Sequence, residues 1–280
     1  MNTWSPDVCG RWSHVADCEY GHQWALSLKC GREWCEICGK DWSDIHKRRF
    51  AGWLPKTQTM AVMGQLTVTI PESLRGTYRD LGELRRLRRS IIRTLKDLGI
   101  DRGLSRWHWF GDKHPGKFHP HLHVLIPRSR LSPKFLDHLK TLVSRKIGAS
   151  KVVINYQFTR SSRKMVHWVK YVTRATFTDA GWDAKFADAL YRFNNTHCWG
   201  CWDELVPQWE LPKDRLITPD VIRLLALERG VCPICGTNLT WQRDPLGRLI
   251  HVLTSRLPEW GFVPDTGGWW FKDIPGEMSP

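Results

Sequence analysis

The sequence predicts an α+β protein in which an antiparallel β-sheet is covered by helices on one side and accompanied by small zinc-binding modules. Three observations lead to this fold class. Between residues 64 and 175, segments with the two-residue period of a strand alternate with segments of helical period. Three histidines alternate within one predicted strand, and most of the nine cysteines fall in closely spaced groups. The first observation predicts the sheet, the second a metal site on it, and the third the zinc modules.

The composition is that of a folded protein with a polyanionic partner. Of the 280 residues 41% are hydrophobic, and 42 lysines and arginines against 28 acidic residues give a net charge of +14. This surplus indicates nucleic acid, and the 17 tryptophans are suited to stacking on single-stranded bases. No stretch approaches the roughly 18 apolar residues of a membrane span, and the N-terminus does not have the pattern of a signal peptide. We therefore expect a cytoplasmic protein with no membrane partner.

Four segments are expected along the chain. A cysteine-rich zinc-binding module is followed by the domain that holds the sheet, by a second zinc-binding module with four cysteines, and by a tail rich in Gly, Pro and Trp. Their predicted bounds are 1–55, 56–180, 181–240 and 241–280.

The sheet domain should begin with a strand at residues 65–70, where polar and β-branched residues alternate. A helix follows over residues 79–98, because leucines and isoleucines recur at helical spacing. The rest of its surface carries five arginines within nine residues, which can either follow a DNA backbone or simply face solvent. The arginines assigned to a DNA contact are Arg85, Arg86 and Arg89.

A β-hairpin then leads into the predicted metal site. Residues 104–110 are aromatic and strand-like, and a Gly/Pro turn connects them to the strand at 117–127. In that strand His119, His121 and His123 alternate ahead of an apolar run, so that their imidazoles point to one face. This arrangement can hold a metal ion with open positions for substrate, and we favour it over histidines that merely face solvent.

An additional metal ligand is expected from the same hairpin. Asp112 in the turn is the first choice, although aspartate is also common in turns for its effect on the backbone. The alternative is His108 on the partner strand.

The domain continues with a helix over residues 132–147, opened by Ser132 and Pro133, a strand over 152–158 and a helix over 163–175. The order from 64 to 175 is thus strand, helix, strand, strand, helix, strand, helix. This is the order of a split βαβ, RRM-like fold.

The helix over residues 163–175 carries a second group of reactive side chains. His167, Lys170, Tyr171 and Arg174 recur at spacings of three and four residues and share one helical face. A tyrosine at the edge of a core is the ordinary explanation. Here, however, the two cations stabilise a phenolate and bind phosphate, as a nucleophile acting on a phosphodiester requires.

The cysteine spacing predicts two structural zinc sites, because clustered cysteines in a reducing compartment bind metal rather than form disulfides. Cys9 and His22 are substitutes if one ligand of the first site is wrong. The expected ligands are Cys18, Cys30, Cys35 and Cys38 in the first site and Cys198, Cys201, Cys232 and Cys235 in the second.

Together these motifs resemble the HUH endonucleases, specifically the rolling-circle replication initiator (Rep) proteins of plasmids and phages with a cysteine-rich segment ahead of the nickase. The resemblance covers roughly residues 18–175. The matching segments are residues 66–69 for the first motif, 119–125 for the metal motif, 170–174 for the tyrosine motif and 30–38 for the cysteine motif.

The resemblance implies that His121 and His123 bind Mg²⁺ or Mn²⁺ and that Tyr171 attacks the scissile phosphate of single-stranded or extruded origin DNA. The products would be a 5′-phosphotyrosyl enzyme and a free 3′-OH, which primes a host polymerase assisted by a helicase. A second transfer rejoins the strand. His119 becomes a neighbour of the metal or a phosphate contact, Lys170 assists catalysis and Arg174 contacts DNA. The replicon would be a prokaryotic plasmid or a virus.

One position departs from the pattern of the family. Related plasmid Rep proteins often carry a glutamate four residues before the tyrosine, where it activates water for termination, and this chain has His167. An imidazole can act as a general base near neutral pH. Alternatively, His167 holds a phosphate, and Tyr171 of a second molecule terminates the reaction.

Two other functions are compatible with the sequence. An HUH-class transposase of an insertion sequence would use the same residues and chemistry. A non-catalytic, zinc-dependent nucleic-acid-binding protein would have no use for a phenol aligned with His167, Lys170 and Arg174, and this alignment favours an enzyme.

Overall fold

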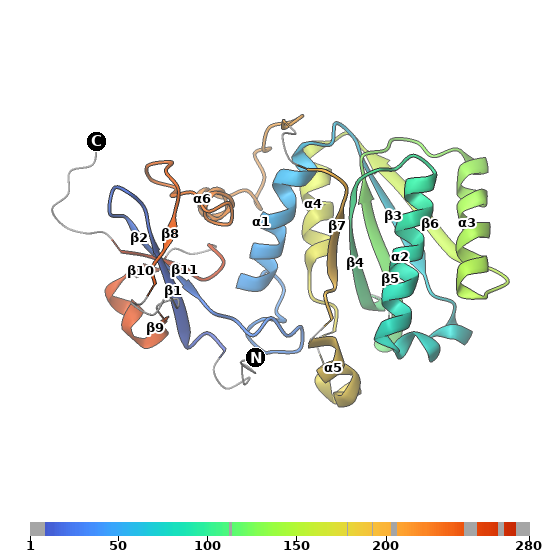
Figure 1. Ribbon diagram of the computed structural model, residues 1–280, viewed down its shortest axis with the longest axis horizontal. Coiled ribbons are helices and arrows are strands. Elements are labelled where there is room, and N and C mark those ends of the chain that lie inside the picture. Colours follow the sequence, from blue (N-terminus) through green and yellow to red (C-terminus); the bar gives the residue numbers. More distant parts are fainter. Residues whose placement is uncertain are drawn as a thin grey trace. The chain divides into compact units, whose positions relative to one another are not determined.

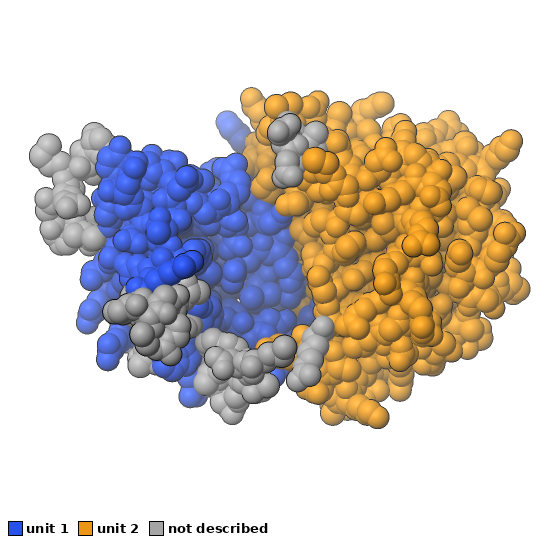
Figure 2. Space-filling model, viewed as in Figure 1, with its two compact units in different colours: residues 1–52, 212–280 blue, residues 53–211 orange. Residues whose placement is uncertain are grey.

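The chain forms two compact units (Figure 2), of which unit 1 combines residues 1–52 with 212–280 and unit 2 contains residues 53–211. The computed structural model describes residues 9–111, 114–177, 179–191, 193–202, 206–243, 251–262 and 266–272. The N-terminal and C-terminal segments, expected as separate modules, thus belong to one unit. Residues 181–211, expected to open the second zinc module, belong with the sheet domain.

Unit 2 is built on a five-stranded antiparallel sheet with the strand order β6-β3-β5-β4-β7. Strand β5 separates β3 from β4, so the β3–α2–β4 segment is a split βαβ unit. The α+β class and the predicted order of elements are confirmed. The main elements are β3 (Met63–Thr69), α2 (Leu81–Asp97), β4 (Gly103–Gly111), β5 (His114–Ile126), α3 (Pro133–Ile147), β6 (Val153–Thr159) and α4 (Ser162–Thr173).

Helices lie on both faces of this sheet (Figure 1). Helices α2 and α3 pack against each other on one face, and α4 lies against β4 on the other. The expectation that helices cover a single side is therefore wrong. The physical reason is visible in β4, whose first eight residues are all buried, because a strand buried on both faces needs cover on both.

The helices of unit 2 begin at side chains that cap them. Asp80, Ser132 and Ser161 each accept a hydrogen bond from the backbone N–H three residues further on, at 2.9, 3.1 and 3.4 Å. Helix α3 ends at Gly148, which has the left-handed φ of 69° that glycine adopts most readily. The cap at Ser161 fixes the start of α4, the helix that carries Tyr171.

The segment that follows α4 returns to the sheet. It contains α5 (Ala184–Tyr191) and β7 (Thr196–Trp199), and β7 pairs with β4 at the edge of the sheet. Short 3₁₀ turns complete the unit; they are η2 (Glu72–Leu74), η3 (Thr77–Arg79) and η4 (Ala180–Trp182).

Unit 1 has a second antiparallel sheet, assembled from both ends of the chain. The hairpin of β1 (Trp12–Asp17) and β2 (Gln23–Ser27) pairs with short strands from the C-terminal segment in the order β10-β11-β2-β1-β8, with β9 also on β1. The predicted Gly/Pro/Trp-rich tail thus contributes strands, and its aromatic residues form cross-strand pairs with the hairpin: Phe271 is opposite Trp24, and their ring centroids lie 4.8 Å apart. The other elements are α6 (Pro219–Leu227), β8 (Thr240–Trp241), β9 (His251–Leu253), η5 (Thr254–Glu259), β10 (Gly261–Phe262) and β11 (Trp269–Lys272). Helix α1 (Asp44–Gln58) runs across the boundary between the units.

Candidate metal centre and tyrosine

Three buried imidazoles converge on one face of the sheet of unit 2. His108 on β4 is paired in register with His121 on β5, and His123 follows two residues later on the same face. Their ring centroids are 4.4 to 5.4 Å apart. Each offers a ring nitrogen within 4.8 Å of those of the other two. Three nitrogen donors from adjacent strands can therefore hold a metal ion.

Hydrogen bonds fix which nitrogen of two of these imidazoles faces the centre. The Nε2–H of His108 donates to the carbonyl oxygen of Val172 at 3.0 Å, and the Nδ1–H of His121 donates to the carbonyl oxygen of His119 at 2.7 Å. A carbonyl can only accept, so each ring keeps its lone pair on the opposite nitrogen. This is the arrangement that orients histidine ligands in metal sites.

The third imidazole has polar partners on strand β3 of a different kind, because the Thr67 hydroxyl can accept or donate a hydrogen bond and the Gln65 Nε2 can only donate one. The Nδ1 of His123 lies 3.1 Å from the hydroxyl oxygen of Thr67 and 3.2 Å from the side-chain amide of Gln65. Within the described part of the chain, His108 Nδ1 and His123 Nε2 are buried without a hydrogen-bond partner. Two buried ring nitrogens without a hydrogen-bond partner fit the role of metal ligands.

Burial favours the neutral form of His108 and His123. Burial, followed by the neighbouring histidines, holds the pKa of His108 well below its usual value, and burial with His121 and Arg174 does the same for the pKa of His123. A neutral imidazole is the form that binds metal.

The structure thus brings together His121 and His123 as predicted and adds His108. Asp112, the preferred additional ligand, lies outside the described residues. His119 is partly exposed, and its ring lies 5.4 Å from that of His121, so it is a neighbour of the cluster. Its backbone carbonyl, rather than its ring, orients His121. The sequence signal for His108 was its place on the partner strand of the hairpin.

Tyr171 on α4 lies against this cluster. Its ring centroid is 5.4 Å from that of His108 and 5.4 Å from that of His123. The guanidinium carbon of Arg174 lies 4.4 Å from the centroid of the Tyr171 ring. A phenol, a cation and a candidate metal site therefore meet at the last turn of α4.

His167 and Lys170 stand on the same helix as Tyr171. Both side chains are partly buried, and their spacing places them on the face of α4 that carries Tyr171.

The arginines of α2 are separated from the histidines by the sheet. Arg85, Arg86 and Arg89 are exposed, and Arg86 forms an ion pair with Glu83. Arg88, in contrast, is buried and donates to backbone carbonyls of the segment before β7. Because α2 and α4 lie on opposite faces, the structure does not place the arginine face at the candidate metal centre.

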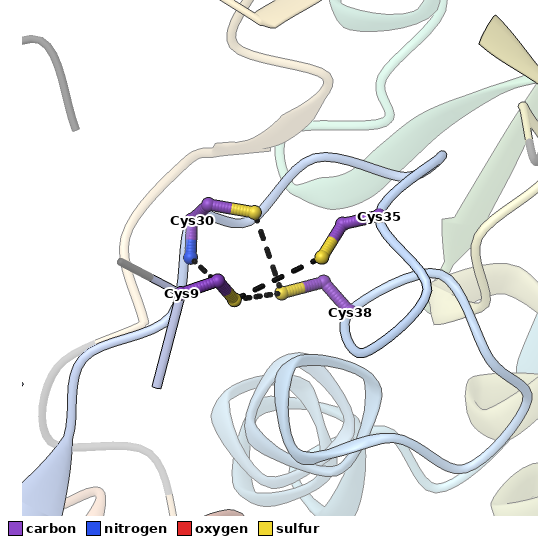
Figure 3. Close-up of side chains that lie close together, drawn as sticks. All are labelled: Cys9, Cys30, Cys35 and Cys38. Carbon is purple, nitrogen blue, oxygen red and sulfur yellow. Dashed lines mark hydrogen bonds between the residues drawn. The ribbon is translucent and has the colours of Figure 1, made fainter. Parts of the chain in front are cut away.

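A four-cysteine cluster in unit 1 is the second candidate metal site. Figure 3 shows Cys9, Cys30, Cys35 and Cys38 pointing toward one another, with sulfur–sulfur distances of 3.5 to 3.8 Å for three of the pairs. The prediction placed Cys18 in this site, which is wrong. Cys9, named as a substitute, takes its position, because the backbone N–H of Cys30 bonds to its sulfur at 3.4 Å.

Two of these thiols differ in acidity. The hydrogen bond from Cys38 lowers the pKa of Cys30 to about 5, whereas burial raises the pKa of Cys9 to about 11. Without a cation, a negative charge on one sulfur raises the free energy of ionising its neighbours. A metal ion would stabilise several thiolates at once.

The third candidate site draws its side chains from both ends of the chain. Cys18 and His22 lie with Cys232 and Cys235, and the four ligand atoms are within 4.8 Å of one another. The expected set with Cys198 and Cys201 is wrong: those two cysteines are exposed and belong to unit 2, whereas Cys232 and Cys235 belong to unit 1.

Among the residues that the structure describes, no helix is long and apolar enough to cross a membrane. Comparison with protein-family models, with curated protein sequences and with solved structures finds no match to this chain.

Proposed function

We propose that unit 2 is a metal-dependent endonuclease that nicks single-stranded DNA and forms a covalent intermediate through Tyr171, as a rolling-circle replication initiator does. The observation that supports this most directly is the contact of Tyr171 with the three-histidine cluster, at 5.4 Å from the rings of both His108 and His123. Tyr171 stands in the last turn of helix α4, next to a cluster that can hold a metal ion. This site has the parts needed for attack on a phosphodiester.

The residues of the site have distinct roles in this proposal. The Tyr171 oxygen forms a bond to the scissile phosphorus, the bond from phosphorus to the 3′ oxygen breaks, and that oxygen takes up a proton. The phenol proton leaves to His167 or to water. Arg174, which lies over the Tyr171 ring, stabilises the phenolate and the charge on the phosphate. The product is a 5′-phosphotyrosyl enzyme with a free 3′-OH.

His108, His121 and His123 would hold a divalent ion, Mg²⁺ or Mn²⁺. Such an ion supplies Lewis-acid polarisation of the non-bridging phosphate oxygens and fixes the phosphate for in-line attack. Three imidazoles are better ligands for a transition-metal ion than for Mg²⁺, which prefers oxygen, and they therefore favour Mn²⁺.

The remaining residues serve termination and DNA binding in this proposal. His167 either activates water or binds a phosphate during the second transfer. The Lys170 ammonium group stabilises the negative charge of that phosphate. Arg85, Arg86 and Arg89 bind backbone phosphates on the other face of the sheet, away from the cleavage site. The net charge of +14 supports a nucleic-acid substrate. The free 3′-OH would be extended by a host polymerase with a helicase.

Zinc is the ion that we propose for the four-cysteine cluster of unit 1. Zinc–sulfur bonds of about 2.3 Å in a tetrahedron place the sulfurs about 3.8 Å apart. The sulfur–sulfur distances of 3.5 to 3.8 Å for three pairs of this cluster fit this geometry.

The proposal is tested by incubating the full chain with a pool of labelled single-stranded DNA and Mn²⁺, followed by electrophoresis in SDS. We expect a DNA–protein adduct that survives denaturation and a labelled 3′-OH product. Tyr171→Phe should abolish the adduct, because the nucleophilic oxygen is gone. His123→Ala should also abolish it while DNA binding in the absence of cleavage persists.

Tyr20→Phe is the matched control, since Tyr20 is a tyrosine of unit 1 with half of its side chain exposed. This variant should form the adduct at the wild-type rate. The nickase assignment fails if the wild type forms no adduct on any sequence of the pool, or if Tyr171→Phe still forms one.

A further inference from the structure

We propose that Cys18, His22, Cys232 and Cys235 bind a zinc ion that fastens the C-terminal segment of the chain to its N-terminal hairpin. This site is independent of the proposed nickase. Its four ligand atoms come from two turns that are 210 to 217 residues apart in the sequence.

The distances among the four side chains lie within about 0.3 Å of those in a tetrahedral zinc site. Cys18 Sγ lies 3.3 Å from His22 Nδ1 and 3.5 Å from Cys235 Sγ, and Cys232 Sγ lies 3.7 Å from His22 Nδ1. Tetrahedral ligands at zinc–sulfur and zinc–nitrogen distances are separated by about 3.5 to 3.8 Å. A disulfide would use two of the three sulfurs and would leave the third with the imidazole, whereas a metal ion uses all four ligands.

The first pair of ligands is held by the turn between β1 and β2. The N–H of Cys18 donates to the carbonyl of His22 at 3.2 Å, and the N–H of Gly21 donates to the carbonyl of Cys18 at 3.0 Å. Gly21 has a φ of 80°, which closes the turn and places the thiol and the imidazole side by side.

The second pair stands on a turn of the kind that zinc-binding CxxC segments form. The N–H of Gly236 donates to the carbonyl of Cys232 at 2.9 Å, and the N–H of Cys232 donates to the carbonyl of Thr237 at 2.8 Å. Gly236 has a φ of 77°, so the chain reverses directly after Cys235 and both thiols point in one direction.

Strand pairing brings the two turns together but does so with few contacts. Among the described residues, β1 and β8 pair through Ala16 with Trp241 and Asp17 with Thr240, directly before Cys18 and shortly after the second turn. So short a ladder gives weak support, and β8 is two residues long. A metal ion at this point would fix the turn that carries Cys232 and Cys235 to the hairpin, in addition to the pairing of β9 with β1 and of β11 with β2.

The proposal is tested by measuring zinc per full-length chain, purified with zinc in the medium, by inductively coupled plasma mass spectrometry. We expect Cys235→Ser and His22→Ala each to lose one zinc relative to the wild type. His22→Cys should keep it, because a fourth thiolate can replace the imidazole. The matched control is the double variant Cys198→Ser/Cys201→Ser, which removes an exposed CxxC pair and should lose no zinc.

A second measurement uses the wild type and does not depend on variants that fold. A pulse of N-ethylmaleimide is followed by peptide mass mapping, before and after zinc is removed with a chelator. Cys18, Cys232 and Cys235 should react together and only after zinc removal. The proposal is overturned if Cys235 reacts equally fast in both states, or if the Cys198/Cys201 variant loses the zinc. Neither readout depends on DNA cleavage, so a failure here and a failure of the nickase assignment are distinguishable.

Discussion

At the scale of single residues, the metal site depends on side chains that hold the ligands in one orientation. His123 can offer its Nε2 to a metal only if the hydrogen sits on Nδ1, and the hydroxyl of Thr67, 3.1 Å away, can accept it. Thr67 stands directly opposite His123 in the pairing of β3 with β5. Thr67 is therefore placed to orient His123 if the cluster holds a metal ion.

Replacing Thr67 by valine should weaken metal binding without disturbing the strand, since the two side chains have the same shape and strand preference. Loss of an outer hydrogen bond to a histidine ligand lowers metal affinity by roughly 10- to 100-fold. We therefore expect the Mn²⁺ concentration for half-maximal adduct formation to rise by about this factor, with recovery at saturating Mn²⁺.

Thr69→Val is the control for this change. Thr69 pairs with His121, whose Nδ1 already donates to a backbone carbonyl. Its Mn²⁺ dependence should stay within about twofold of the wild type. An unchanged Mn²⁺ dependence of Thr67→Val would show that the Thr67 hydroxyl does not orient the ligand.

At the scale of elements, strand β4 determines where helix α4 ends. The last carbonyls of a helix have no partner within it. Two side chains of β4 supply partners: His108 donates to the carbonyl of Val172, and Arg106 donates from Nε to the carbonyl of Arg174 at 3.3 Å. Arg106 is only 2% exposed and also donates to the hydroxyl of Thr196 on β7 at 3.0 Å. Tyr171 is thereby fixed over the histidines.

The variant Arg106→Met tests this role, because it keeps the length of the side chain and removes its donors. Leaving a buried carbonyl without a partner costs about 1 to 3 kcal/mol. We expect the free energy of unfolding of the sheet domain to fall by that amount and the rate of adduct formation to fall with it, while the Mn²⁺ dependence is unchanged. Arg145→Met, at an exposed position in the last turn of α3, should change neither quantity. Equal effects of the two variants would contradict the proposed role of Arg106.

Periodicity predicted the elements of unit 2 because each carries its own signal, such as the leucine spacing of α2 or the alternating histidines of β5. It did not predict the contacts between β4 and α4. Asp112 was preferred to His108 as the additional metal ligand. The sequence alone does not give the register of the hairpin, and the register decides which of the two side chains lies beside His121. That register pairs His108 with His121 and shifts only beyond it.

At the scale of the whole molecule, the sequence predicted clusters of cysteines that could hold metal ions, but it grouped the cysteines differently from the structure. Neighbouring CxxC pairs were assigned to one site because short spacing is the usual signal. In the structure, unit 1 is formed by the segments that precede and follow unit 2 in the sequence. Cys18 and His22 therefore lie close to Cys232 and Cys235. A local sequence pattern cannot predict a contact between residues that are more than 200 positions apart. In the structure this contact results from the pairing of β1 and β2 with C-terminal strands.

The two kinds of metal site should respond differently to chelation. Structural zinc held by thiolates binds with an apparent free energy of about 10 to 16 kcal/mol, whereas three neutral imidazoles leave a divalent ion exchangeable. A brief passage through EDTA should therefore abolish adduct formation and leave zinc content and melting temperature unchanged, and added Mn²⁺ should restore the adduct. Prolonged treatment with phenanthroline should remove zinc and change the near-ultraviolet circular dichroism of the buried Trp24 and Trp269 in unit 1. Added zinc, and not Mn²⁺, should reverse this second change. If EDTA alone lowers the melting temperature, or if zinc removal leaves the tryptophan signal intact, the separation of a catalytic ion from structural zinc is wrong.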